Sequence, residues 1–553
     1  MVRFRNKPCH LSRRVLWPAV LLLLALIPFA NLAQEPGQSS LGIISGKVVD
    51  ANSGAPLARC SVQIDPTGQG GQSGSARSVV TADDGQFIFE GVAPGKYRLS
   101  ANKRGYLRQE YEEHENFSTA IAIGPKLTAE GLIFKVTPQA VISGEVTDQN
   151  GEPVRGAQVR LFKDQERMGL QSVVRRQAVV ADDRGIYEIP NVGPGNYYLA
   201  VSAQPWYTQR MMRFDGGRED SSSELDVAYP TTFYAQVTNS DDATPIPIKG
   251  GERIQANVTL TAQQAMRLPI KLPLQEPAQD PSQDPAHSHE YTVVLSQSVF
   301  GQMEPFTIGM VNTPDGTVTD GILPGHYEVT VSQHGFGAPS STRFETDVAS
   351  GDAELTPVEA ESEITVAGKV SSLDGKTPVG GIILQPTNRG RPYQATLGPA
   401  GEFTVQVLPG DYEVIGQLPQ MYLARIRTQD AELKDHVLPV KAGGAPKLEI
   451  LASKGFGQID GIVQRGDQPV SGVMVLLAPE DNRILFRRDQ SDSDGTFSLT
   501  NIVPGRYRLL AIEGGWELEW GNRDVLNAFL KRSILVEVHA NDKLTRTVES
   551  QSR

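Results

Sequence analysis

His287 and Glu290 have the spacing that comes nearest to a catalytic metal site. A His-x-x-Glu pair supplies two zinc ligands, but a hydrolytic zinc site also needs a third ligand and an open position for water. The pair follows a proline-rich stretch, residues 276–285, which lacks lysine and arginine and is expected to be an extended, solvated linker. The chain contains no H-E-x-x-H, G-x-S-x-G, P-loop or Gly-rich dinucleotide motif. We therefore expect a protein that is not an enzyme.

Three acidic turns form a second group of candidate ligands. Each turn places two carboxylates beside a glycine: Asp83 and Asp84, Asp182 and Asp183, and Asp492 and Asp494. Such a turn could give calcium two or three of the six to eight oxygens that it takes. The alternative, that each aspartate caps its own turn, is favoured because the 12-residue ligand spacing of a calcium loop is missing. Structural calcium stays open as a ligand, and no other cofactor is expected.

Aromatic side chains form a third group, in stretches that follow a repeated tetrapeptide. A sugar stacks its C–H groups on an aromatic face, so these residues are candidates for carbohydrate binding: Tyr106, Tyr111, Trp206, Tyr207, Trp516 and Trp520. The alternative is that they anchor long loops onto the domain core, which suits side chains with an apolar body and one polar tip. This second interpretation is the more strongly favoured of the two.

The elements that would position these residues are marked by the tetrapeptide Pro-Gly-x-Tyr. It occurs five times, at intervals of about 100 residues, which indicates an array of similar small domains. The copies are Pro94-Gly95-Lys96-Tyr97, Pro194-Gly195-Asn196-Tyr197, Pro324-Gly325-His326-Tyr327, Pro409-Gly410-Asp411-Tyr412 and Pro504-Gly505-Arg506-Tyr507.

Each copy ends a recurring order of strand and turn signals. In the first, a strand over 44–50 carries Gly46 where neighbouring atoms must come close, Asp84-Gly85 predicts a hairpin, and Pro94-Gly95 predicts a type II turn. The hairpin glycine and the turn proline are nine positions apart in the first, second and fifth copies but eight in the others. Strands have period two, so the shorter copies need a shortened loop or a lost β-bulge to keep register.

These signals predict an all-β chain of five β-sandwich modules. We place them at residues 40–138, 139–262, 263–357, 358–450 and 451–553, the third being divergent and preceded by the proline-rich linker. With strands of roughly 20 Å plus loops, an elongated array would approach about 150 Å.

The recurring pattern resembles the carboxypeptidase regulatory-like domain. The resemblance rests on Ser45-Gly46-Lys47-Val48, Pro153-Val154-Arg155-Gly156-Ala157, Asp182-Asp183-Arg184-Gly185-Ile186-Tyr187 and the Pro-Gly-x-Tyr copies, and it is weak in the third module. It implies a prealbumin-like, seven-stranded Greek-key sandwich, also classed as a carbohydrate-binding-like fold, in secreted bacterial multi-repeat proteins. Such domains are usually non-catalytic accessories.

The first 33 residues predict a secretory signal peptide. Five basic residues precede the apolar run 15–30, which is broken by two prolines and is short for a membrane span, although a retained anchor is the alternative. After cleavage only Cys60 remains, so no intrachain disulfide forms. We expect a secreted protein, periplasmic or extracellular, without a stable membrane span.

The charge excludes one class of partner. The net charge of −12 becomes −17 when the five basic residues of the signal are removed, and such an acidic surface opposes nucleic acid binding. We expect a polysaccharide or a cell-surface component as partner, with other secreted proteins as a second choice. The leading function is thus a binding scaffold. The alternatives are a structural spacer or protein-interaction array and, more remotely, an accessory part of a secreted peptidase.

Overall fold

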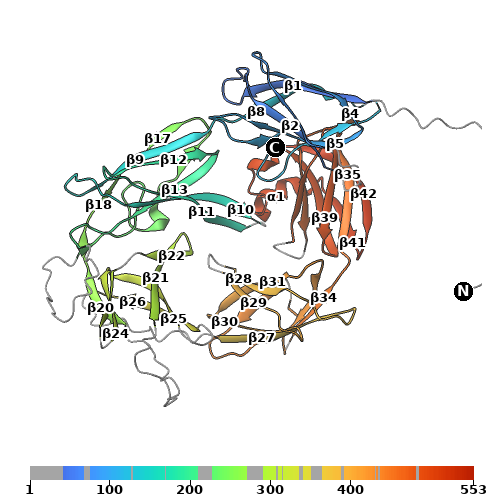
Figure 1. Ribbon diagram of the computed structural model, residues 1–553. Coiled ribbons are helices and arrows are strands. Elements are labelled where there is room, and N and C mark those ends of the chain that lie inside the picture. The colour runs from blue at the N-terminus through green and yellow to red at the C-terminus, as the bar shows by residue number, and fades with distance from the viewer. Residues whose placement is uncertain are drawn as a thin grey trace, which may run out of the picture.

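The computed structural model confirms an all-β chain of β-sandwiches in tandem (Figure 1). It describes residues 41–67, 75–125, 127, 129–167, 170–208, 227–270, 290–306, 309–313, 316–334, 340–349, 364–387, 392–429, 431–433, 436–480 and 485–553. The expected signal peptide 1–33, the proline-rich linker 276–285 and His287 lie outside these residues.

Module one packs the sheet β4-β1-β8 against the sheet β3-β2-β5, whose strand β5 also pairs with β6 and β7. Ile44 and Phe134 from one sheet meet Val62 and Leu99 from the other, and all four side chains are buried. The strands are β1 Gly42–Asp50, β2 Ser61–Pro66, β3 Arg77–Val80, β4 Gln86–Val92, β5 Gly95–Asn102, β6 Gln109–Glu110, β7 Ile121–Ile123 and β8 Ala129–Val136.

Module two repeats this plan with β12-β9-β17 and β11-β10-β13-β15, and β14 pairs with β19. Its core gathers around Ile142, Val159 and Leu199. The elements are β9 Ala140–Asp148, β10 Gln158–Arg167, β11 Leu170–Val180, β12 Ile186–Val192, β13 Gly195–Ser202, β14 Val227–Ala228, β15 Thr232–Phe233, η1 Ser240–Asp242, β16 Ile246–Ile248, β17 Arg253–Gln255, β18 Val258–Leu260 and β19 Gln263–Gln264.

Modules three and four follow the same plan, with two sheets each. Module three forms the sheets β20-β24-β23 and β22-β21-β25-β26, and module four forms β30-β27-β34-β32 and β29-β28-β31-β33. The strands are β20 Met266–Ile270, β21 Glu290–Val299, β22 Gln302–Phe306, β23 Gly309–Thr313, β24 Gly316–Ile322, β25 Gly325–His334, β26 Ser340–Val348, β27 Ile364–Ser372, β28 Gly381–Pro386, β29 Tyr393–Thr396, β30 Glu402–Val407, β31 Gly410–Gln417, β32 Tyr422–Arg427, β33 Val437–Val440 and β34 Lys447–Ser453.

Among the described residues, module five differs from the others in carrying an α-helix after its Pro-Gly-x-Tyr strand. Asn522 caps this helix, since its side chain accepts a hydrogen bond from the Asp524 N–H. The elements are β35 Gly457–Arg465, β36 Gln468–Pro469, β37 Met474–Pro479, β38 Arg487–Gln490, β39 Thr496–Ile502, β40 Gly505–Glu513, η3 Gly515–Glu517, α1 Arg523–Leu530, β41 Ile534–Val538 and β42 Lys543–Ser552. Modules one and five each show eight described strands where seven were expected, because short strands (β6, β36) form within loops.

The structure explains the repeated Pro-Gly-x-Tyr. The tyrosine hydroxyl donates back to the carbonyl four residues earlier, from Tyr97 to Ala93 at 2.9 Å and from Tyr507 to Val503 at 2.6 Å. Tyr327 and Tyr412 do the same. The expected type II turn is not what the glycine makes: Gly95 has φ of +152° and begins β5, and the tyrosine ring lies 3.9 Å from where its Cβ would be. A Cβ at this position would be in ordinary van der Waals contact with the ring, so the positive φ rather than lack of space favours glycine.

A β-bulge before the Pro-Gly explains part of the difference in spacing between modules. In modules one, two and five, the strand before the Pro-Gly carries one extra residue opposite its partner, with Gly91, Asn191 and Asn501 at positive φ. The corresponding pairing of β27 with β30 in module four runs without a shift, so the bulge is lost there. Module three keeps a bulge at Gly321, φ +83°, so its shortening lies elsewhere. Of the two mechanisms expected from the sequence, the lost bulge therefore occurs in module four.

Neighbouring modules two and three share a small apolar cluster. Phe162, Ala200 and Phe233 of module two pack with Val299 and Phe300 of module three. Beside it, the buried Glu304 carboxylate lies 3.5 Å from Arg160 and 2.8 Å from Arg175. Burial lowers the pKa of Arg160, and Glu304 opposes this shift.

The modules do not extend into the rod that the sequence predicted. They follow one another around a ring in Figure 1, and the ring closes where module one meets module five. Lys96 of module one pairs with Asp492 of module five, 396 positions later in the chain. The prediction of an elongated array is therefore wrong, because two complementary surfaces, one in the first module and one in the last, bind each other.

Candidate functional site

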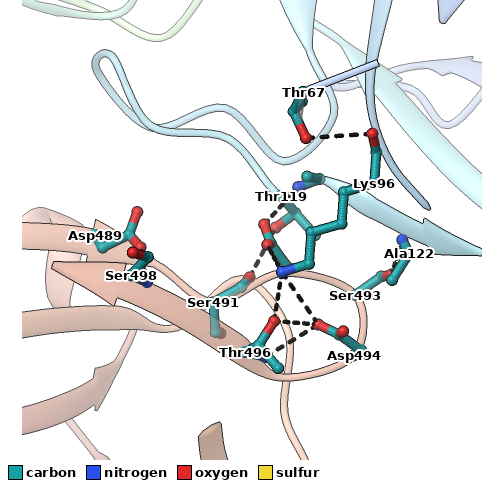
Figure 2. A network of polar contacts seen from close by, with 12 residues as sticks. Thr67, Lys96, Thr119, Ala122, Asp489, Ser491, Ser493, Asp494, Thr496 and Ser498 are labelled. Carbon is teal, nitrogen blue, oxygen red and sulfur yellow. Dashed lines mark hydrogen bonds and ion pairs between the residues drawn. The ribbon is translucent and has the colours of Figure 1, made fainter. Parts of the chain in front are cut away.

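The contact between modules one and five holds a network of polar side chains (Figure 2). On module five it involves the hairpin of residues 491–495 between β38 and β39, here called the docking hairpin. On module one it involves Lys96 together with Thr119, Ala120 and β7, here called the docking edge. Residues 491–495 contain the third of the predicted acidic turns, that of module five.

Main-chain groups of the docking edge bind the docking hairpin directly. The Ser493 N–H donates to the Ala120 carbonyl at 2.9 Å, and the Ala122 N–H donates to the Ser493 hydroxyl at 2.8 Å. The Ala120 N–H donates to Asp492 Oδ1 at 3.0 Å. The hairpin thus satisfies an edge that would otherwise present free N–H and C=O groups.

Lys96 supplies the charge that the acidic hairpin requires. Its ammonium pairs with Asp492, lies 3.8 Å from Asp494 Oδ1 and donates to the Thr496 hydroxyl at 2.5 Å. The Asp494 carboxylate accepts from the Thr496 N–H at 3.1 Å and from its hydroxyl at 2.6 Å, which fixes the turn. A single lysine therefore contacts two carboxylates and one hydroxyl of this acidic turn and the residue that follows it.

A second cluster around Arg488 extends the contact. Its guanidinium forms two hydrogen bonds to Glu115 of module one, at 3.1 and 2.7 Å, and lies 4.0 Å from the ring centre of Trp520. The His114 ring stacks on Trp516, with centres 5.2 Å apart and planes at 6°. Bidentate and cation–π contacts of this kind require a specific geometry, so they favour one relative orientation of the two modules.

A cleft of about 650 Å³ opens beside these contacts, between Lys96 and Arg98 on one side and Asp460, Asp489 and Ser498 on the other. Burial raises the pKa of Asp489 to about 6, although the Ser498 and Gln490 N–H groups act in the opposite direction. Burial also raises the pKa of Asp492, and Lys96 opposes this shift.

The predicted aromatic residues lie in three different environments. Tyr106 is half-buried and its hydroxyl donates to Asp50 at 2.9 Å. Tyr111 packs edge-to-face on Phe134, and burial raises the pKa of Tyr111 to about 12. Both tyrosines pack against the core of module one, as the loop-anchoring interpretation describes.

The tryptophans divide between module five and module two. Trp520 is 2% exposed and packs against Phe486, so its ring offers no free face to a sugar. Trp516 is half-buried beneath His114 and Phe117 of module one. Trp206 is instead 73% exposed and Tyr207 37% exposed, with their ring centres 5.6 Å apart. Only this pair presents an open aromatic surface among the six candidates.

The acidic turns of modules one and two are exposed and cap themselves. Asp84 accepts from the Gln86 N–H at 3.0 Å, and Asp182 accepts from the Arg184 and Ile186 N–H groups at 2.9 and 2.8 Å. Asp83 and Asp183 are exposed at the turn tips. Within the described residues, no group of three or more His, Cys, Asp or Glu side chains is arranged to hold a metal ion. These contacts are those of the turn-capping alternative.

Sequence reasoning missed the contact of Lys96 with the docking hairpin and that of Glu115 with Arg488. A signal was present in the variable residue of Pro-Gly-x-Tyr, which is Lys96, Asn196, His326, Asp411 and Arg506 in the five modules. A basic residue here in module one and an Asp-Ser-Asp turn in module five are complementary. The repeat alone gives no reason to pair them.

The fold and this internal contact define a multi-domain β-sandwich protein whose first and last modules bind each other. Residues 43–122 and 141–228 match the carboxypeptidase regulatory-like domain, and residues 453–536 match the second beta sandwich domain of the BOS complex subunit NOMO1-like proteins. The chain is accordingly a tandem carboxypeptidase regulatory-like β-sandwich protein. Within the described residues no helix is long and apolar enough to cross a membrane.

Three of the solved structures that the chain matches are bacterial proteins. The TIE protein of Bacillus anthracis is 9% identical, with 93% of this chain and 75% of that chain covered and a TM-score of 0.17. The minor pilin GBS52 of Streptococcus agalactiae is 12% identical, with 42% and 100% covered and a TM-score of 0.21. The major pilin subunit BcpA of Bacillus cereus is 11% identical, with 74% and 99% covered and a TM-score of 0.15. No curated protein matches the chain.

Proposed function

We propose that this chain is a secreted, non-catalytic scaffold that binds carbohydrate or a cell-surface component through Trp206 and Tyr207. The observation that carries the proposal is the exposure of Trp206, 73%, beside a second aromatic ring. Isolated apolar side chains are common on surfaces, but here the exposed Trp206 ring has Tyr207 beside it at an interplanar angle of 84°, so the indole face can stack with a sugar ring while the tyrosine borders it. Export rests on the signal expected in residues 1–33.

The surroundings of this pair support a binding role. The turn that carries Trp206 is held by Thr208, whose N–H and hydroxyl both donate to the Pro205 carbonyl, at 3.0 and 2.8 Å. Tyr207 also hydrogen-bonds to the buried Tyr229. Aromatic side chains held in this way lose little conformational entropy when a ligand binds.

The test is binding of polysaccharides and glycans by a purified protein that begins at residue 34. We expect saturable binding that falls at least tenfold in Trp206→Ala, which corresponds to about 1.4 kcal/mol. Leu373→Ala is the matched control, because Leu373 is an apolar side chain of similar exposure, 72%, in another module. Equal binding by both variants, or none by the folded wild type, would reject the proposal.

A structural or protein-interaction scaffold is the second candidate. The contact of Lys96, Arg488 and the docking hairpin favours it, since the residues there bind another module of the same chain. This function predicts no glycan affinity and no effect of Trp206→Ala. A screen for hydrolytic activity with and without a chelator tests the non-catalytic part of both proposals.

A further inference from the structure

The contact between modules one and five is built differently from the contact between modules two and three. Modules two and three share the buried cluster of Phe162, Phe233 and Phe300. Across the module one to five contact, the described apolar clusters stay within their own modules, and the bonds are ion pairs, amide hydrogen bonds and aromatic contacts of half-buried rings. Polar contacts of this kind between domains open and close in solution more readily than apolar ones.

The docking edge of module one is specific among the five modules. The residue paired with the variable residue of Pro-Gly-x-Tyr is Ala122 in module one, Pro247 in module two, Asp347 in module three, Pro439 in module four and Glu537 in module five. Proline has no N–H to donate, and the two acidic residues would repel an acidic hairpin. Only module one combines a small residue that donates its N–H with the basic Lys96.

The docking hairpin is equally distinct in its burial. Asp492 and Asp494 are half-buried against module one, whereas the corresponding Asp83, Asp84, Asp182 and Asp183 are exposed. Ser493 also supplies both an N–H donor and a hydroxyl acceptor to the edge. Hairpin and edge are therefore a matched pair, one at each end of the chain.

We propose that a second copy of this chain is the partner for these two surfaces, so that the docking hairpin of one molecule binds the docking edge of another. The contacts are the same within a chain and between chains. The docking hairpin can bind the docking edge of its own chain or that of a second copy. Which of the two forms then depends on the effective concentration of the two surfaces within one chain, which the intervening modules set, compared with the concentration of the protein. Exchange of identical contacts between copies is a low-cost route to dimers, and reciprocal exchange leaves neither surface unpaired.

The test uses two charge-reversed variants of the protein that begins at residue 34. The edge variant is Lys96→Glu with Glu115→Arg, and the hairpin variant is Asp492→Lys with Arg488→Glu. Each reverses both ion pairs on one side only, so like charges face each other within each chain and disfavour closure. In a mixture, the unaltered hairpin of the first variant meets the unaltered edge of the second, and the two reversed surfaces also match.

We expect each variant alone to have the mass of a monomer by light scattering, and the equimolar mixture to have twice that mass. Hydrogen exchange gives a second readout, because the Ala120 and Ala122 N–H groups donate to the hairpin. Their protection should fall in each variant and return in the mixture. The matched control carries all four substitutions in one chain, which restores both ion pairs with their signs exchanged, so its mass and its protection should equal those of the wild type at the same concentration. A mixture that keeps the mass of a monomer overturns the proposal.

Discussion

Asp489 illustrates how a single buried carboxylate affects stability. Burial raises its pKa to about 6 from the usual value near 3.8, so the folded protein binds a proton that the unfolded chain has released between these values. The folded state is therefore penalised as the pH rises through about 6, and the penalty vanishes below about pH 4.

Replacing this carboxylate should therefore stabilise module five at neutral pH. We expect Asp489→Asn to raise the free energy of unfolding by about 1–3 kcal/mol at pH 7.5 and to have little effect at pH 4, since each pKa unit corresponds to about 1.4 kcal/mol. The asparagine oxygen retains an acceptor for the Ser498 N–H, which now bonds Asp489 at 2.7 Å. Fluorescence of Trp516 and Trp520 follows the unfolding. A stabilisation that is equal at both pH values would contradict this account.

Tyr507 permits a test of the repeated tetrapeptide. The ring is 1% exposed and its hydroxyl donates to the Val503 carbonyl at 2.6 Å, while burial raises its pKa to about 12 and keeps the donor proton in place. Tyr507→Phe leaves that carbonyl without its partner and should cost about 1–2 kcal/mol of stability. Urea unfolding followed by the same tryptophans measures the loss, and an unchanged midpoint would argue against a role for the hydroxyl.

Several residue-scale features could be predicted from the sequence. The expected close approach at Gly46 is confirmed, because a Cβ there would meet the Leu132 carbonyl, and the same holds at Gly461 with Arg546. The burial of the Trp520 side chain could not be predicted. Its burial depends on Phe486 and Arg488, which come from a strand region more than thirty positions earlier in the chain. A loop aromatic has the same local sequence signal whether it packs or faces solvent.

At the scale of elements, the alternation of residues and the Asp-Gly turns predicted the strands and hairpins. Gly85, Gly185 and Gly495 have φ values of 79°, 72° and 78°, as the hairpin prediction required. The eight-residue spacing in module four predicted a shortened loop or a lost bulge, and the lost bulge is the one that occurs. The internal contact of Lys96 was not predictable, because charge pairs between distant elements leave no periodic pattern.

The bulge in module two makes a prediction about Asn191. This residue has φ of 60°, a left-handed conformation that asparagine tolerates and glycine adopts freely, and module one has Gly91 at the same position. Asn191→Ala should destabilise module two by about 1 kcal/mol, whereas Asn191→Gly should be neutral or slightly stabilising. Thermal unfolding of the paired variants, with hydrogen exchange on β12, separates them. Equal stability of the two would mean that the bulge relaxes when asparagine is lost.

At the scale of the whole molecule, the sequence indicated five modules but suggested a rod. Local signals define each sandwich, whereas the ring depends on a single match between the first and last modules. Exposed ion pairs contribute only about 0–1 kcal/mol each. Closure therefore rests on several weak contacts acting together: the amide bonds of Ala120 and Ala122, the pair of Lys96 and Asp492, and the Arg488 cluster.

This balance predicts that the shape of the molecule responds to one of these contacts. An extended array would measure about 150 Å. In dilute solution, small-angle scattering of the wild type should give a maximum dimension well below that value. Asp492→Lys replaces an attraction with a repulsion beside Lys96 and should lengthen the molecule, and Asp183→Lys, at the exposed tip of the module two turn, is the control. High salt should shift the wild type in the same direction, because it screens the ion pairs that favour closure. If the dimension stays the same in Asp492→Lys, the aromatic stack of Trp516 on His114 must hold the ring without the lysine, and Trp516→Ala in the same background should then open it.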